Sequence, residues 1–190
     1  MNAPAIRLMS AADFLAWCLD RDDGRWELVR GVPTRAMTGA TRRHDTVVVN
    51  LIASLKPRLK GGPCSPHTAG QALRAAEDTI RRPDVTVDCG LTAANALESS
   101  QPSVAFEVLS PSTRKTDRFR KVEEYKSVTS LQHIVLIDPD RPAVLLYARG
   151  ADGVWTNEEF EGLERALPLT ALGLELPLAE VYEGLTFEAE

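Results

Sequence analysis

Two short runs rich in β-branched residues each carry one carboxylate, and together they constrain this chain more than any other feature. Residues 84–89 read D-V-T-V-D-C and open with Asp84, and residues 103–109 read S-V-A-F-E-V-L and hold Glu107 between two apolar residues. A strand interior is normally apolar, and a buried carboxylate without a partner costs several kcal/mol. We therefore expect a hydrogen-bond network, a basic partner or a metal ion at these two residues.

Strand alternation sharpens this expectation. In the second run Glu107 shares a face with Ala105 and Leu109, and in the first run Asp84 faces the same way as Thr86. If the two runs are neighbours in a sheet, Asp84 and Glu107 converge on one face with apolar residues packed behind them. Two carboxylates that share a site repel each other, so the arrangement favours a hard divalent cation with oxygen ligands.

The segment after the second run predicts a helix over residues 113–128. Phe119, Val122 and Tyr125 form its apolar stripe, and Lys121 lies at the edge of that stripe. From this edge the stem of Lys121 can lie on apolar surface while its ammonium reaches a nearby polar site. The alternative is a solvated lysine on a charged helix, and spacing alone favours that alternative.

Several motifs in order resemble a known family. P-D at residues 83–84 is followed by E-V-L-S-P-S-T-R-x-x-D-x-x-x-K-x-x-x-Y-K from Glu107, and W-E-L-V-R-G-V-P stands near the start. His44 opens an apolar helix, and L-x-L-P-L-A-E-V-Y-E-G comes late in the chain. Across 10–184 this set resembles the Uma2 family (the DUF820 group) of the PD-(D/E)xK nuclease superfamily.

The resemblance implies roles for particular residues. Asp84 and Glu107 would hold the metal, and a lysine would position or activate the attacking water. The usual strand position for that lysine holds Leu109 here, whereas in similar proteins it is thought to have moved to the following helix, where Lys121 stands. We therefore predict that the Lys121 ammonium lies within about 6 Å of a carboxylate oxygen of Asp84 or Glu107.

Two further residues are open to two interpretations each. Glu27 stands between Trp26 and Leu28 in a predicted strand, so alternation alone makes it solvent-facing, while the resemblance suggests that it joins the metal or water network. His44 lies on the apolar face of a helix predicted over residues 41–59. A histidine there is more often a hydrogen-bonded core residue than a ligand, and only the resemblance suggests a place beside the site.

Composition and charge bound the class of protein. The chain has 190 residues, 44% of them hydrophobic, which favours one domain over 1–190, with a frayed acidic tail at 185–190. Its net charge of −5 does not by itself indicate a nucleic-acid binder. Local basic pairs such as Arg42-Arg43 and Arg81-Arg82 are candidates for phosphate contacts. We expect no membrane segment. The three cysteines are odd in number, so we expect small buried thiols in a reducing, cytoplasmic compartment.

The order of predicted elements indicates an α/β (mixed α+β) fold. A helix at 11–19, a strand pair around Gly31, the helix at 41–59, several strands, the helix at 113–128 and further strands suggest a central mixed sheet flanked by helices. A short helix is expected at 178–182. The core implied by the resemblance, a helix followed by three strands, a helix and a strand, is restriction-endonuclease-like and fits this order.

These expectations lead to one main functional hypothesis. It is an endonuclease that hydrolyses DNA phosphodiester bonds with Mg²⁺ or Mn²⁺ on Asp84 and Glu107, helped by the Val108 carbonyl. Cutting both DNA strands is most simply done by two sites, so we expect a homodimer, and the apolar strands 131–137 and 143–148 could leave an edge that needs cover. The rivals are a catalytically silent module that binds nucleic acid or protein, and a metal phosphoesterase for small phosphate esters.

Overall fold

The largest sheet has six strands in the order β10-β9-β8-β7-β6-β3. The structure, a computed structural model, describes residues 8–36, 40–91, 93–110 and 117–187. Strands β7 and β8 are parallel, and the other neighbouring pairs of this sheet are antiparallel, which confirms the mixed central sheet. The strands are β3 (Ser65–Thr68), β6 (Val85–Asp88), β7 (Pro102–Val108), β8 (His133–Asp138), β9 (Ala143–Arg149) and β10 (Trp155–Glu161).

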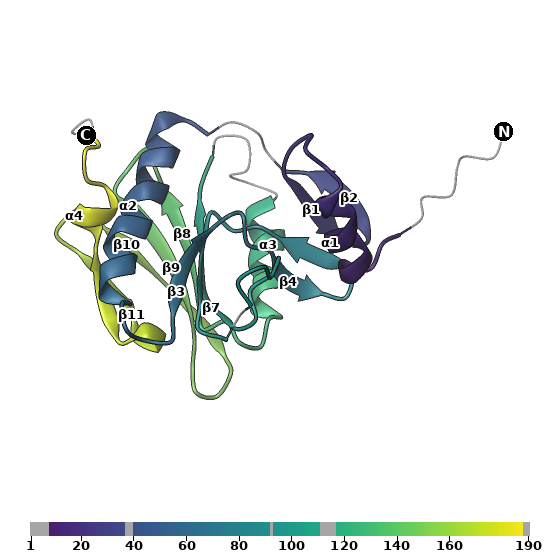
Figure 1. The fold of residues 1–190 in the computed structure, drawn as a ribbon. Coiled ribbons are helices and arrows are strands. Elements are labelled where there is room, and N and C mark those ends of the chain that lie inside the picture. Colours follow the sequence, from purple (N-terminus) through teal and green to yellow (C-terminus); the bar gives the residue numbers. More distant parts are fainter. Residues whose placement is uncertain (1–7, 37–39, 92, 111–116, 188–190) are drawn as a thin grey trace.

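Helices cover both faces of this sheet (Figure 1). Leu51 and Leu55 of α2 pack with the valines of β6 and β7 on one face, where α4 also lies. On the other face Ala105 of β7 packs with Val122 and Tyr125 of α3. The expected core order occurs as α2, β3, β6, β7, α3 and β8 within the six-stranded sheet and its helices. The helices are α1 (Ala11–Leu19), α2 (Arg42–Arg58), α3 (Asp117–Lys126) and α4 (Leu178–Val181).

A second sheet brings the N-terminal part of the chain against α3. Its four strands have the order β2-β1-β5-β4 and are all antiparallel. In Figure 1 α3 lies beside β4, and Leu73 of that strand packs with Val122 and Tyr125 of the helix. Side chains of α3 are therefore covered by both sheets. The strands are β1 (Trp26–Val29), β2 (Val32–Arg35), β4 (Leu73–Ala76) and β5 (Thr79–Arg81).

Local sequence explains two elements that carry the site. The Thr41 hydroxyl accepts a hydrogen bond from the backbone N–H of His44 at 3.2 Å, so α2 is capped and His44 lies in its first turn. The hairpin of β1 and β2 turns at Arg30 and Gly31, whose φ angles are 49° and 78°. A two-residue turn with positive φ at both positions matches the twist of a hairpin, and this turn sets the register that places Glu27.

Some expectations about individual elements are wrong. Phe119, predicted in the buried stripe of the site helix, is 67% exposed. That helix ends at Lys126, and residues 113–116 of the predicted range lie outside the described residues. Strand β5 was not predicted because its three residues follow a loop-like pair, Glu77-Asp78, with little room for alternation.

The cysteines also differ from the expectation. Cys64 and Cys89 form a disulfide, and Cys18 is the free thiol. The pair is 25 residues apart in the chain, but β3 pairs Ser65 with Asp88, so the same register brings the two cysteines opposite each other. Disulfides are rare in cytosolic proteins, so the cysteines no longer support the predicted cytoplasmic location.

The C-terminal part of the chain completes the core. Strands β11 (Ala166–Leu169) and β12 (Leu174–Pro177), with the 3₁₀ turn η1 (Thr170–Leu172) between them, form a small hairpin that was not predicted. Leu185 and Phe187 pack against the core, so the first part of the tail is not frayed. None of the helices in the described ranges is both long and apolar enough to cross a membrane.

Candidate active site

The two strand carboxylates face each other across β6 and β7. The register pairs Val85 with Phe106, and one further step places Asp84 opposite Glu107. Residues directly opposite in an antiparallel pair point to the same face with Cβ atoms about 5 Å apart. The side chains are 20% exposed for Asp84 and 13% for Glu107. The charge of Asp84 raises the pKa of Glu107, so the two acids lie close together as predicted, while their convergence on one face stays a prediction.

Helix α3 directs two groups at Glu107. The ammonium of Lys121 lies 3.1 Å from each carboxylate oxygen of Glu107, so the predicted proximity is confirmed. The hydroxyl of Tyr125, one turn further along the helix, donates a hydrogen bond to Oε1 of Glu107. Sequence analysis assigned Tyr125 to the apolar stripe alone, although its spacing of four residues from Lys121 put both side chains on neighbouring positions of the helix.

The environment of Glu107 makes its negative charge costly. The pKa of Glu107 is raised to about 7. Burial is the largest cause; the charge of Asp84 also raises the pKa, while Lys121 and the Tyr125 hydrogen bond lower it. Burial outweighs the lysine because an ionised carboxylate loses much of its hydration between the sheets and the helix. A further cation near Glu107 and Asp84 would favour the ionised form.

Asp84 is held by α2 and by the neighbouring strand. Its Oδ2 atom lies 3.3 Å from Nε2 of His44 and accepts a hydrogen bond from the backbone N–H of Val108 at 2.8 Å. The hydrogen bond with Asp84 raises the pKa of His44, against the opposing effect of burial. His44 therefore lies beside the site, as the resemblance implied. The Val108 group that touches Asp84 is the N–H, and the metal-binding role of its carbonyl stays a prediction.

Glu27 is a buried member of the same cluster. Its residue is 7% exposed, so the solvent-facing interpretation is wrong. Strand β1 lies between β2 and β5, and this position turns Glu27 toward α3. One of its oxygens, Oε2, is 2.7 Å from the guanidinium of Arg81, and the other, Oε1, accepts the backbone N–H of Arg82 at 3.1 Å and lies 3.8 Å from Nζ of Lys121.

Comparison with known proteins places this arrangement in a family. The Uma2 family, described as "Putative restriction endonuclease", matches residues 11–179. The chain belongs to the Uma2 family. The match includes all six residues predicted for the site, since they lie between Glu27 and Lys121.

One relative and one solved structure resemble this Uma2 protein over nearly their whole lengths. The "Uncharacterized protein slr1290" of Synechocystis sp. is 28% identical over 188 residues, which cover 98% of this chain and 97% of that one. The crystal structure of "a putative nuclease belonging to DUF820" from Anabaena variabilis superimposes with a TM-score of 0.72 at 17% identity, covering 92% of this chain and 97% of the other. The fold is thus that of the DUF820 protein.

Sequence analysis missed the role of Arg81. It suggested that Arg81 and Arg82 contact phosphates, but Arg81 is 1% exposed and its Nε donates to Glu124 at 2.6 Å while another of its nitrogens contacts Glu27. Arg82 donates to the backbone carbonyls of Trp26 and Gly70. A buried arginine follows from β5, the strand that the sequence did not reveal.

The donor set of this Uma2 protein suits a particular class of metal. Among the described residues no three histidine, cysteine, aspartate or glutamate side chains form a ready-made metal site. Two facing carboxylates match Mg²⁺ or Mn²⁺ instead, because Mg²⁺ keeps several waters and takes only one or two carboxylates from a protein. Within the described part of the chain, the contacts to Asp84 converge on Oδ2. Its Oδ1 is therefore left for a cation, and the residues present fit such an ion.

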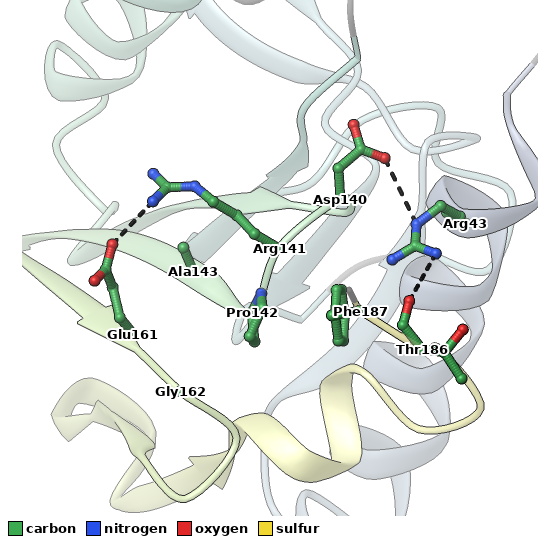
Figure 2. Close-up of a pocket in the computed structure, with 9 residues that line it drawn as sticks. All are labelled: Arg43, Asp140, Arg141, Pro142, Ala143, Glu161, Gly162, Thr186 and Phe187. Atoms are coloured by element: carbon green, nitrogen blue, oxygen red, sulfur yellow. Dashed lines mark hydrogen bonds and ion pairs between the residues drawn. The ribbon is translucent and has the colours of Figure 1, made fainter. Parts of the chain in front are cut away.

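An open pocket of about 740 Å³ contains none of the residues predicted for the site (Figure 2). Arg43, next to His44 in α2, lies 3.5 Å from Asp140 and stacks on the Phe187 ring. Figure 2 also shows Arg141 paired with Glu161, so the charges in this pocket balance one another. Its lining consists of Arg43, Asp140, Arg141, Pro142, Ala143, Glu161, Gly162, Thr186 and Phe187.

Proposed function

We propose that this Uma2 protein is a divalent-metal-dependent endonuclease that hydrolyses DNA phosphodiester bonds. The observation that carries the proposal is the facing pair Asp84 and Glu107, with the Lys121 ammonium 3.1 Å from both oxygens of Glu107. Membership of a family described as "Putative restriction endonuclease" and the fold shared with "a putative nuclease belonging to DUF820" support the same reaction class.

Each residue of the cluster has a task in this proposal. Asp84 and Glu107 would hold Mg²⁺ or Mn²⁺, which when bound would lower the pKa of water and stabilise charge on the phosphate. His44 and the Val108 N–H orient Asp84, and Tyr125 orients Glu107.

Lys121 takes the place of the missing strand lysine. Its ammonium, 17% exposed, lies where it can orient the attacking water and stabilise negative charge on a phosphate next to Glu107. Leu109, which stands at the usual lysine position, packs partly buried on the α3 side of the sheet. A lysine introduced at 109 would therefore emerge on the same face as Glu107.

A second candidate function follows from the same contact. The Lys121 ammonium engages both oxygens of Glu107, so the chain itself supplies a counter-charge for that carboxylate. This closed ion pair suits a catalytically silent module that keeps the fold to bind nucleic acid or protein. Binding of a divalent cation together with loss of cleavage on mutation separates the enzyme from the silent module.

Assembly and location are further parts of the proposal. A homodimer would place two sites on the two DNA strands. The edge argument for a dimer is wrong, because β8 and β9 each have neighbours on both sides and the edges of the sheet are β10 and β3. The proposed dimer therefore depends only on the argument that cutting both DNA strands needs two sites. The proposed cytoplasmic location depends on the need of such a nuclease to reach intracellular DNA.

The proposal is tested by cleavage of supercoiled plasmid in Mg²⁺ or Mn²⁺, with RNA and nitrophenyl phosphate esters as parallel substrates. We expect plasmid cleavage by the wild type, its loss in Asp84→Ala and Glu107→Ala, and its loss in Lys121→Ala with partial recovery in Lys121→Ala/Leu109→Lys. The exposed carboxylate variant Glu161→Gln is the matched control and should cleave normally. Wild-type rates in Asp84→Ala or Glu107→Ala would refute the site, and preference for the esters would make the protein a phosphoesterase.

A further inference from the structure

The proposed reaction does not use the least exposed charged residue in the described part of the chain. Arg81, the last residue of β5, is 1% exposed. Its guanidinium binds Glu27 of β1 at 2.7 Å and Glu124 of α3 at 2.6 Å. Burying three charges is costly unless their geometry is well matched. The chain nevertheless places them directly behind the candidate active site.

The charges from Arg81 to Glu107 alternate in sign. Glu27 contacts Arg81 through Oε2 and lies 3.8 Å from Nζ of Lys121 through Oε1. Nζ of Lys121 then lies 3.1 Å from Glu107. Lys121 is thus held between two carboxylates, one from each sheet. Both oxygens of Glu27 have a donor of the chain, Arg81 or the backbone N–H of Arg82, which suits an anchor better than a metal ligand.

Arg81 also fixes α3 directly. Glu124, its partner on α3, is three residues from Lys121 and next to Tyr125. Residues three apart on a helix are neighbours on its surface, so the contact at Glu124 sets the rotation of the helix that presents Lys121. Arginine suits this task because its rigid planar fork engages two carboxylates in fixed directions, whereas a lysine offers a flexible point charge.

We infer that Arg81 is a positioning residue, which through Glu27 and Glu124 holds the Lys121 ammonium against Glu107. The inference rests on the proposed function where it concerns catalysis, but the placement of Lys121 is measurable without any activity. It assigns Glu27 and Glu124 to the support of Lys121 and leaves metal binding to Asp84 and Glu107.

The kinetic test uses Arg81→Lys, which keeps the charge and loses the fork. We expect kcat for Mg²⁺-dependent plasmid cleavage to fall about tenfold or more, since small misplacements of a catalytic group are costly, with an unchanged dependence on Mg²⁺ concentration. In the partly active Lys121→Ala/Leu109→Lys background the same change should cause no further loss, because it acts through Lys121, which that background lacks. Arg74→Lys, which alters an exposed bidentate pair with Glu98 in the same sheet, is the control and should leave kcat unchanged.

The activity-independent test measures the mobility of lysine ammonium groups by NMR in ¹⁵N-lysine-labelled protein. The order parameter of Lys121 Nζ should fall in Arg81→Lys, while that of Lys126, which pairs with Glu123 on the same helix, should stay unchanged. Glu124→Gln keeps Arg81 and Glu27 paired and should lower the order parameter of Lys121 Nζ in the same way. This variant replaces Arg81→Lys in the test if Arg81→Lys does not fold. An unchanged Lys121 signal, or additive kinetic losses, would overturn the inference. A wild type that cleaves nothing, with the expected NMR change, would instead refute the proposed function alone.

Discussion

Two arginines of this protein each form ion pairs with several carboxylates, one in the protein interior and the other on the surface. Arg81 binds Glu27 and Glu124 with a side chain that is 2% exposed. Arg141 binds Asp138, Glu159 and Glu161 on the surface with a side chain that is 58% exposed, beside the pocket in Figure 2. The number of ion pairs that an arginine makes therefore does not indicate how much those pairs contribute to stability.

The difference lies in what each cluster does to its neighbours. Around Arg141 water screens the charges, and the exposed side chains of Glu159 and Glu161 can change rotamer at little cost. Around Arg81 no water compensates a lost partner, so each charge fixes the position of the next, as far as Lys121 and Glu107. The buried cluster around Arg81 can therefore hold Lys121 in one position, whereas a surface cluster such as that of Arg141 cannot.

The largest expected effect separates the two clusters by stability. Arg81→Met removes the closest cation from the buried Glu27 and the partly buried Glu124, so we expect the free energy of unfolding to fall by about 3–5 kcal/mol. Arg141→Met should change it by less than about 1 kcal/mol. Urea denaturation followed by circular dichroism measures both. Equal losses in the two variants would break the comparison.

A combined variant gives the control for this prediction. Replacing Glu27, Arg81 and Glu124 together by Leu, Met and Leu removes the charges along with their desolvation, so most of the stability lost in Arg81→Met should return. The combined variant should still cleave plasmid about tenfold or more slowly than the wild type, because the charges that place Lys121 are gone.

A smaller effect is expected from pH in metal-free buffer. The pKa of Glu107 is raised from 4.5 to about 7, so between these values the folded state holds a proton that the unfolded state has released. Stability from this group is full below pH 4.5 and is lost as the pH rises through 7. Urea denaturation at pH 5 and pH 8 measures the fall in the free energy of unfolding between the two pH values. This fall should be larger by about 1–3 kcal/mol in the wild type than in Glu107→Gln. Equal falls in the two proteins would show that Glu107 does not titrate in this way.

Much of the site was readable from the sequence because its residues come from strongly patterned segments. Alternation in residues 84–89 and 103–109 predicted that Asp84 and Glu107 converge, and helical spacing with the family motif predicted Lys121 beside them. The contact of Lys121 with Glu107 confirms the second placement, and the register of β6 and β7, extended by one residue, brings Asp84 opposite Glu107. Those elements are local in sequence, so short-range periodicity carries the information.

The support of the site could not be read in the same way. Arg81 and Glu27 meet Glu124 only because β1 and β5 pair and α3 lies against that sheet. Strand β5 has three residues, too few for a period to appear. The Cys64–Cys89 bond depends likewise on the pairing of β3 and β6, which spacing in the sequence does not reveal.

The most direct test of the whole account is calorimetric titration of the metal-free protein with Mn²⁺. We expect one cation to bind per chain, and binding to weaken at least about tenfold in Asp84→Asn and in Glu107→Gln, since each removes one of two protein ligands. Binding should also be weaker at pH 6 than at pH 8, because a proton on Glu107 competes with the cation. Glu161→Gln should bind like the wild type. A wild type that binds no cation, or carboxylate variants that bind it equally well, would contradict the account.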